Sequence, residues 1–154
     1  MQLSKDFRLK EFTQSDVAMR NGIDNTPPPE AVENLRKLCK FVLQPVRDGI
    51  QRPIKITSGY RSPELNTLIG GSDRSQHCWG YAADIEMQGV TTKSLALNIA
   101  HDCSFDQIIL EFFDPKDDYS GWVHVSYVSP ERNRKQILTA YKENGKTKYK
   151  DGIA

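Results

Sequence analysis

The sequence of 154 residues has few cysteines, almost no net charge and no long apolar run. Its three cysteines are widely spaced and make a poor disulfide framework, so we expect them to be reduced, as in a protein synthesised in the cytoplasm. A balance of 21 basic and 20 acidic residues gives no reason to expect a nucleic-acid partner. No segment approaches the length of a membrane span, and the first residues lack the apolar core of a signal peptide.

With 38% hydrophobic and 27% charged residues, the composition is typical of one globular domain, which we place over residues 1–154 and expect to be monomeric. Residues 1–26 are interpreted as an N-terminal arm. Residues 135–150 are interpreted as a basic C-terminal hairpin, because Asn144-Gly145 is a strong hairpin turn. Its basic side chains fit a solvated edge, or a weak attraction to an anionic polymer such as a cell-wall glycan.

Apolar periodicity predicts both helices and strands. A long helix is expected over residues 29–48, where apolar side chains recur at helical spacing after three prolines. Shorter helices are expected over residues 63–69 and 91–101, and strands over residues 53–57, 82–86, 106–113 and 121–127. Because helices and antiparallel strands are partly segregated along the chain, the fold class is α+β.

Three side chains of the kind that bind metal stand out. His77 and Asp84 lie seven positions apart with Gly80 between them, and His124 lies in the apolar run 122–127. Taken alone, each can be explained without a metal: the histidines as surface or core residues, and the aspartate as a residue that caps a turn. Together, two imidazoles and one carboxylate suit a single Zn²⁺ with one position left for water, which is the arrangement of a catalytic zinc. The third histidine, His101, ends a predicted helix, where the helix dipole favours a cation.

Peptide hydrolysis at such a site needs a general base, and Glu111 is the best candidate. It lies in an otherwise apolar strand, where an unpartnered carboxylate is costly to bury. If this strand pairs with residues 121–127, alternation would place Glu111 on the same face as Trp122, His124 and Ser126. The alternative is an edge glutamate that reaches solvent. The other candidate bases, Asp117 and Asp118, look like loop carboxylates.

Substrate contacts are expected from residues near the metal loop. Arg61 follows a predicted strand, and its guanidinium could bind a substrate carboxylate or stabilise a developing oxyanion. The structural alternative is a salt bridge that holds the turn. We also expect Tyr60, Ser75, Gln76 and Trp79 to line the cleft.

Residues 75–84 fit the pattern SxHxxGxAxD, which resembles the signature of the zinc D-alanyl-D-alanine carboxypeptidase family. That family includes L-alanyl-D-glutamate endopeptidases that serve as phage endolysins. Residues 58–62 are similar to its SG(F/Y)RS turn, and residues 122–126 to the strand with its second histidine ligand. The resemblance covers roughly residues 26–130. It implies an α+β fold shared with the Hedgehog signalling domain, in which a small antiparallel sheet is flanked by helices.

The resemblance also implies roles for residues. His77, Asp84 and His124 would bind zinc, and Arg61 would contact the peptide substrate. Many family members carry Asp or Glu three residues before the last histidine, but this chain has Gly121 there. The base must therefore come from elsewhere, which again favours Glu111.

We therefore expect a zinc peptidase that hydrolyses a peptide bond in the stem peptide of bacterial peptidoglycan, like a compact phage endolysin. It would act on the wall after release from the cytoplasm, or as part of a virion. One alternative is a D,D-carboxypeptidase or dipeptidase acting on small peptides that contain D-alanine. Another is an inactive module that keeps zinc and binds the cell wall or a virion partner.

Overall fold

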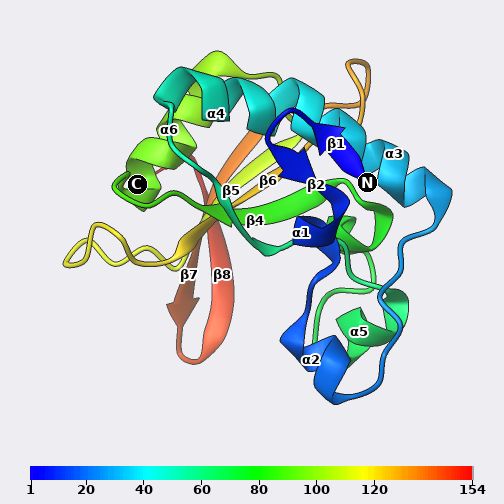
Figure 1. The fold of residues 1–154 in the computed structure, drawn as a ribbon. Helices are drawn as coiled ribbons and strands as arrows, with labels where there is room; N and C mark the ends of the chain where they lie inside the picture. The colour runs from blue at the N-terminus through cyan, green and yellow to red at the C-terminus, as the bar shows by residue number, and fades with distance from the viewer. Residues whose placement is uncertain (154) are drawn as a thin grey trace.

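The computed structural model describes residues 1–153 and is built around a six-stranded mixed sheet (Figure 1). The spatial order of its strands is β3-β4-β6-β5-β7-β8. The strands are β3 (Lys55–Ser58), β4 (Ala82–Glu86), β5 (Gln107–Glu111), β6 (Trp122–Ser126), β7 (Gln136–Glu143) and β8 (Lys146–Asp151). Neighbouring strands are antiparallel except β5 and β7, which pair in parallel. The α+β class is confirmed, and the parallel pair is an addition to the antiparallel sheet that we expected.

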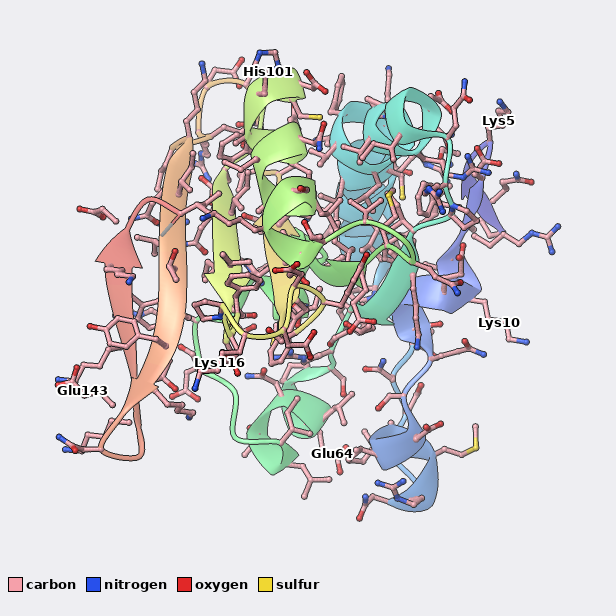
Figure 2. All side chains as sticks on the ribbon, turned by 90° about the vertical axis from the view of Figure 1, so that its left-hand side faces the viewer. Lys5, Lys10, Glu64, His101, Lys116 and Glu143 are labelled. Atoms are coloured by element: carbon pink, nitrogen blue, oxygen red, sulfur yellow. The ribbon has the colours of Figure 1, made fainter. Side chains whose placement is uncertain are left out.

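The long predicted helix is present as three consecutive segments, α3 (Pro29–Leu38), a π-helical turn η1 (Cys39–Leu43) and α4 (Gln44–Ile50). Helix α6 (Thr92–Asp102) packs beside α4, and both lie on one side of the sheet (Figures 1 and 2). Alternate strand residues point toward these helices and form the core: Ala83, Ile85, Ile108, Val123 and Val125. The intervening residues point to the opposite face, so strand alternation gives the sheet one apolar face and one face free for polar groups.

The N-terminal segment folds against this core. It contains β1 (Gln2–Ser4), β2 (Phe7–Arg8), α1 (Leu9–Thr13) and α2 (Asp16–Arg20). Phe7 and Phe12 are almost fully buried, with their ring centroids 6.2 Å apart. The carbonyl of Phe12 accepts a hydrogen bond from the Tyr60 backbone at 2.7 Å, which ties this segment to the turn after β3. Helix α5 (Pro63–Leu68) follows that turn, and the Ser62 hydroxyl caps it as expected.

The C-terminal hairpin forms where the Asn-Gly turn predicted it. Asn144 and Gly145 both have positive φ, 53° and 75°, as a tight two-residue hairpin turn requires. Figure 2 shows Glu143 at the tip of this hairpin, away from the helices. All three cysteines are free, as expected. Within residues 1–153, no helix has both the length and the apolar character needed to cross a membrane.

Candidate metal centre

A short 3-10 helix, η2 (Gln76–Trp79), presents His77. The Ser75 hydroxyl caps this helix by accepting a hydrogen bond from the His77 backbone N–H at 3.3 Å. Gly80 ends it with a φ of +77°, and a Cβ there would lie 2.3 Å from the carbonyl oxygen of Ala31 in α3. Only glycine permits both this conformation and this close approach, so Gly80 fixes the metal loop against the long helix.

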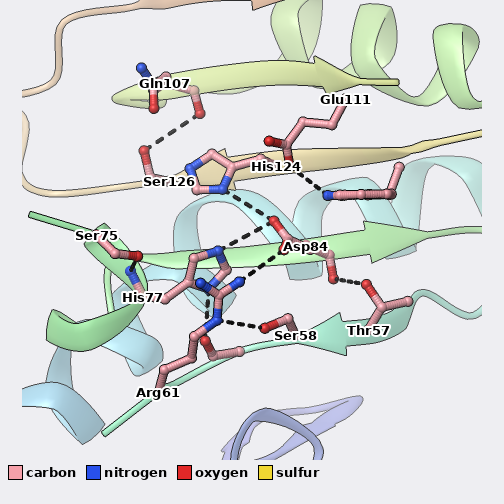
Figure 3. A network of polar contacts seen from close by, with 12 residues as sticks. Thr57, Ser58, Arg61, Ser75, His77, Asp84, Gln107, Glu111, His124 and Ser126 are labelled. Carbon is pink, nitrogen blue, oxygen red and sulfur yellow. Dashed lines mark hydrogen bonds and ion pairs between the residues drawn. The ribbon is translucent and has the colours of Figure 1, made fainter. Parts of the chain in front are cut away.

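Asp84 and His124 come from neighbouring strands, β4 and β6, and are direct partners in the antiparallel register. His77 reaches the same point from η2 (Figure 3). The Oδ1 atom of Asp84 lies 3.3 Å from His77 Nε2 and 3.1 Å from His124 Nδ1. All three side chains are buried, and one potential ligand atom from each lies within 4.8 Å of the others. The structure therefore brings together the three residues that the sequence suggested.

The geometry of this cluster fits zinc. Bonds of about 2.0–2.1 Å in a tetrahedron place neighbouring ligand atoms about 3.3 Å apart, which is close to the spacing around Asp84 Oδ1. The Nδ1 atom of His77 lies 2.8 Å from the carbonyl oxygen of Gly59. Because a carbonyl can only accept a hydrogen bond, Nδ1 carries a proton, and Nε2 is the nitrogen that lies toward Asp84 and would bind a metal. A metal-binding histidine is commonly oriented by a backbone carbonyl in this way.

The Asp84 carboxylate is held in its charged form. Burial by itself would raise its pKa, but the nearby His77 and His124 together hold the pKa well below its usual value. A deprotonated carboxylate is the form that binds a metal ion. The cluster thus combines one carboxylate oxygen with two imidazole nitrogens, a donor set that suits Zn²⁺.

Arg61 is part of the same network (Figure 3). Its Nη2 atom lies 3.6 Å from Asp84 Oδ2, its Nε donates to the Ser58 hydroxyl at 3.2 Å, and its Nη1 donates to Asn66 Oδ1 at 3.4 Å. The salt bridge that we considered as the structural alternative is therefore present. Arg61 also lines the cleft above the cluster, so its position is compatible with contact to a substrate.

Glu111 ends β5 and lies directly opposite Trp122 of β6, two residues from the position that pairs with His124. The predicted shared face is confirmed, and the edge-strand alternative is wrong because β5 lies between β6 and β7. The Trp122 indole N–H donates a hydrogen bond to Glu111 Oε2. Burial, followed by the negative charge of Asp84, raises the pKa of Glu111. A raised pKa makes this carboxylate a stronger base than an ordinary glutamate, which suits a group that accepts a proton and returns it.

Gly121 explains the departure from the family pattern. Its φ is +67°, and a Cβ there would lie 2.1 Å from the backbone carbonyl oxygen of Glu111. An acidic side chain at this position would collide with β5, so the carboxylate near the metal centre comes from β5 instead. The loop acids Asp117 and Asp118 are exposed and do not line the cleft.

A cleft of about 450 Å³ opens over the cluster. Ser75 and Gln76 line it as expected, but Tyr60 and Trp79 do not. They face a separate pocket of about 350 Å³ beside α3 and α5. Tyr60 turns into the core, and Trp79 lies near α3, where Asn34 donates a hydrogen bond to its carbonyl. The prediction that these two aromatic residues line the metal cleft is therefore not supported.

Several residues in or beneath the cleft were not predicted, and three of them matter most for its chemistry. Arg134, from the segment before β7, and Tyr149, from β8, line it directly. Asp106 lies beneath Arg134 and binds its guanidinium. No local pattern marked them, because Arg134 and Tyr149 reach the site only through the pairing of β7 with β5 and of β8 with β7. Asp106 is placed beside them by its backbone hydrogen bonds to Ser126 and Gln136.

A family model described as Peptidase M15 matches residues 5–126 of the chain. The matched region contains the whole His77–Asp84–His124 cluster together with Arg61 and Glu111. No curated protein sequence matches the chain.

Proposed function

Because the chain belongs to the peptidase M15 family, whose members are zinc-dependent, we propose that it is a metallopeptidase that cuts a peptide bond in the stem peptide of bacterial peptidoglycan. The observation that carries this proposal is the His77–Asp84–His124 cluster at the floor of a cleft that also holds Glu111. A cluster with three protein ligands leaves one coordination position free, as catalytic zinc sites do.

The two histidines and Asp84 would hold one zinc ion. When bound, the ion supplies Lewis acidity that polarises the scissile carbonyl and makes water a better nucleophile. The ligands come from the separate elements η2, β4 and β6, so their mutual distances are set by the fold and not by one flexible segment.

Glu111 is the proposed general base. It accepts a proton from the attacking water and then donates it to the nitrogen of the leaving amine. Its elevated pKa supports the second step, because a more basic carboxylate holds the proton long enough to deliver it. The hydrogen bond from Trp122 fixes the carboxylate on the metal side of the sheet.

Substrate would lie along the cleft between Ser75 and Gln76 on one side and β5 on the other. Arg61 is placed to contact it and also orients Asp84. The side chain of Arg134 and the residue Tyr149 at the far wall are each more than half exposed, so that wall is accessible to solvent. An accessible groove favours cleavage within a longer peptide over removal of one C-terminal residue from a closed pocket.

Digestion of purified peptidoglycan by the zinc-loaded protein tests this proposal, with the released muropeptides identified by mass spectrometry. We expect fragments that arise from cleavage of one stem-peptide bond. Glu111→Gln should bind zinc but lose at least about 100-fold in rate. The matched control Glu143→Gln, at the exposed hairpin tip, should retain full activity.

Other outcomes contradict the assignment. Full turnover by Glu111→Gln would show that another group is the base. Activity only on short peptides ending in D-Ala-D-Ala would favour the carboxypeptidase. Zinc binding without cleavage of either substrate would favour an inactive binding module.

A further inference from the structure

Arg134 is anchored in the cleft wall by a buried carboxylate. Its Nε and Nη2 atoms donate to the two oxygens of Asp106 at 3.0 and 2.7 Å, and its backbone N–H donates to Asp106 Oδ1 at 2.9 Å. The Asp106 side chain is only 2% exposed, whereas the Arg134 side chain is 52% exposed. A two-pronged bond of this kind fixes the plane of a guanidinium as well as its charge.

The same carboxylate ties Arg134 to the metal loop. Gln76 Nε2 donates to Asp106 Oδ2 at 2.7 Å, and Gln76 directly precedes His77. Asp106 precedes β5, which carries Glu111. The position of Arg134 is therefore set relative to both the metal cluster and the proposed base.

Arg134 keeps unused donors. A guanidinium has five N–H groups, and Asp106 takes two of them. Within residues 1–153, the other three have no hydrogen-bond partner, and the residue lines the cleft. An arginine held on one edge and free on the other is prepared to bind a planar anion such as a carboxylate.

The other two arginines in the cleft are less suited to this role. Arg61 is already engaged by Asp84, Ser58 and Asn66. Arg74 lies on an exposed loop, where the Ser72 hydroxyl holds its backbone N–H and no residue among 1–153 hydrogen-bonds its side chain. Freezing a mobile arginine side chain costs conformational entropy on binding, and Arg134 avoids that cost because Asp106 already orders it.

We propose that Arg134 binds a carboxylate of the peptide substrate and makes the enzyme selective for acidic peptides. The inference rests on the proposed function, because the stem peptide of peptidoglycan contains glutamate. The carboxylate of that glutamate is negatively charged when it is free and is replaced by a neutral group when it is amidated. Arg134 lies beyond residue 126, where the family match ends, so family membership does not supply this contact. The C-terminal segment of this chain would thus determine specificity.

Two synthetic stem peptides test the inference. They have the same sequence, and the side group of their glutamate is a free carboxylate in one and a primary amide in the other. Wild type should cleave the acid with a kcat/KM at least about tenfold above that of the amide, as expected for one charge-assisted hydrogen-bonded pair. Arg134→Gln should lose this preference by cleaving the acid more slowly, with the amide changed less than about twofold.

Controls separate recognition from folding. Arg132→Gln removes an equal charge two residues away, outside the cleft, and should keep the wild-type preference. Arg134→Lys keeps the charge without the two-pronged geometry and should show an intermediate preference. If Arg134→Gln slows cleavage of both peptides equally, or if wild type does not distinguish them, Arg134 is a structural residue and the inference is wrong.

Binding can be measured without turnover. Calorimetric titration of both peptides into zinc-loaded wild type and Arg134→Gln, each also carrying Glu111→Gln, compares affinities directly. Tighter binding of the acid, lost in Arg134→Gln, supports the inference even if no peptide is cleaved, in which case only the proposed peptidase function fails. Equal affinities of the Arg134-containing protein for the two peptides would overturn the inference.

Discussion

Asp84 and His124 face each other directly across the β4–β6 ladder, with Asp84 Oδ1 3.1 Å from His124 Nδ1. Directly opposed residues in an antiparallel pair have their Cβ atoms about 5 Å apart and point to the same face. Two of the three proposed zinc ligands are thus positioned by backbone pairing within the sheet. Only His77 depends on the conformation of a loop.

Zinc should therefore stabilise the protein measurably. We expect one equivalent of zinc by elemental analysis, and a fall in the thermal midpoint after chelation. The linked stabilisation is about 4 kcal/mol when free zinc exceeds its dissociation constant a thousandfold. His124→Ala should bind no zinc, and its midpoint should not respond to chelator. His101→Ala, whose side chain is 89% exposed, should behave like wild type. A full equivalent of zinc in His124→Ala would rule out this ligand set.

Trp122→Phe should change the pH profile of catalysis. Burial is the main cause of the raised pKa of Glu111, and the hydrogen bond from Trp122 opposes it by favouring the ionised carboxylate. Without that bond the pKa should rise further, so the acidic limb of kcat/KM should move to higher pH, and the rate at pH values on that limb should fall. Steady-state rates between pH 5 and 9 measure this.

Trp79→Phe is the matched control, because this indole lies on the other pocket. It should leave both the rate and the pH profile unchanged. An unshifted acidic limb in Trp122→Phe would mean that the indole does not act on Glu111.

Gly121→Ala should be more destabilising than Gly145→Ala. Both glycines have positive φ, +67° and +75°, and each substitution should cost about 1 kcal/mol for the backbone conformation. A Cβ at Gly145 would meet no atom of the described residues within 4 Å, whereas one at Gly121 would collide with the Glu111 carbonyl. We expect a loss of about 3 kcal/mol or more for Gly121→Ala from urea unfolding. Equal losses would show that β5 and β6 separate easily there.

The Asp106–Arg134 pair should contribute stability at neutral pH that is lost in acid. Burial would raise the pKa of Asp106, but hydrogen bonds from Arg134 and Gln76 bring it below its usual value. The folded protein therefore binds this proton less readily than the unfolded chain. Its contribution is complete above about pH 4, the unfolded pKa, and disappears as the pH falls through the lower folded pKa.

Asp106→Asn should accordingly lower the free energy of unfolding by about 2 kcal/mol at pH 7, a value reduced because Arg134 is half exposed. The difference from wild type should shrink at pH 3. Urea unfolding measures this difference in the free energy of unfolding. A chelator is added so that pH-dependent metal binding does not contribute to the difference. The exposed Asp118→Asn, which removes an equal charge from the surface, is the control and should leave the free energy of unfolding at pH 7 nearly unchanged. A constant difference at both pH values would contradict the role of ionised Asp106.

Some features follow from short-range patterns and were predicted correctly. The long helix follows from apolar spacing within one segment, and the hairpin from a dipeptide that tolerates positive φ. The cluster of His77, Asp84 and His124 follows from ligand types on a spacing that resembles a known signature. For the helix, the hairpin and the segment from His77 to Asp84, neighbouring residues contain the information, whereas His124 joins the cluster through the pairing of β4 with β6.

The tertiary structure decided the rest. Several contacts join segments that are distant in the sequence. They are the strand register that places Glu111 beside Trp122, the parallel pairing of β5 with β7, and the ion pair between Arg134 and Asp106. Tyr60 and Trp79 likewise face a different pocket because of how they pack near α3. The sequence by itself determined which side chains could bind a metal and where the chain turns, because those are local properties. Which groups surround the candidate metal cluster was decided only when strands far apart in the chain paired.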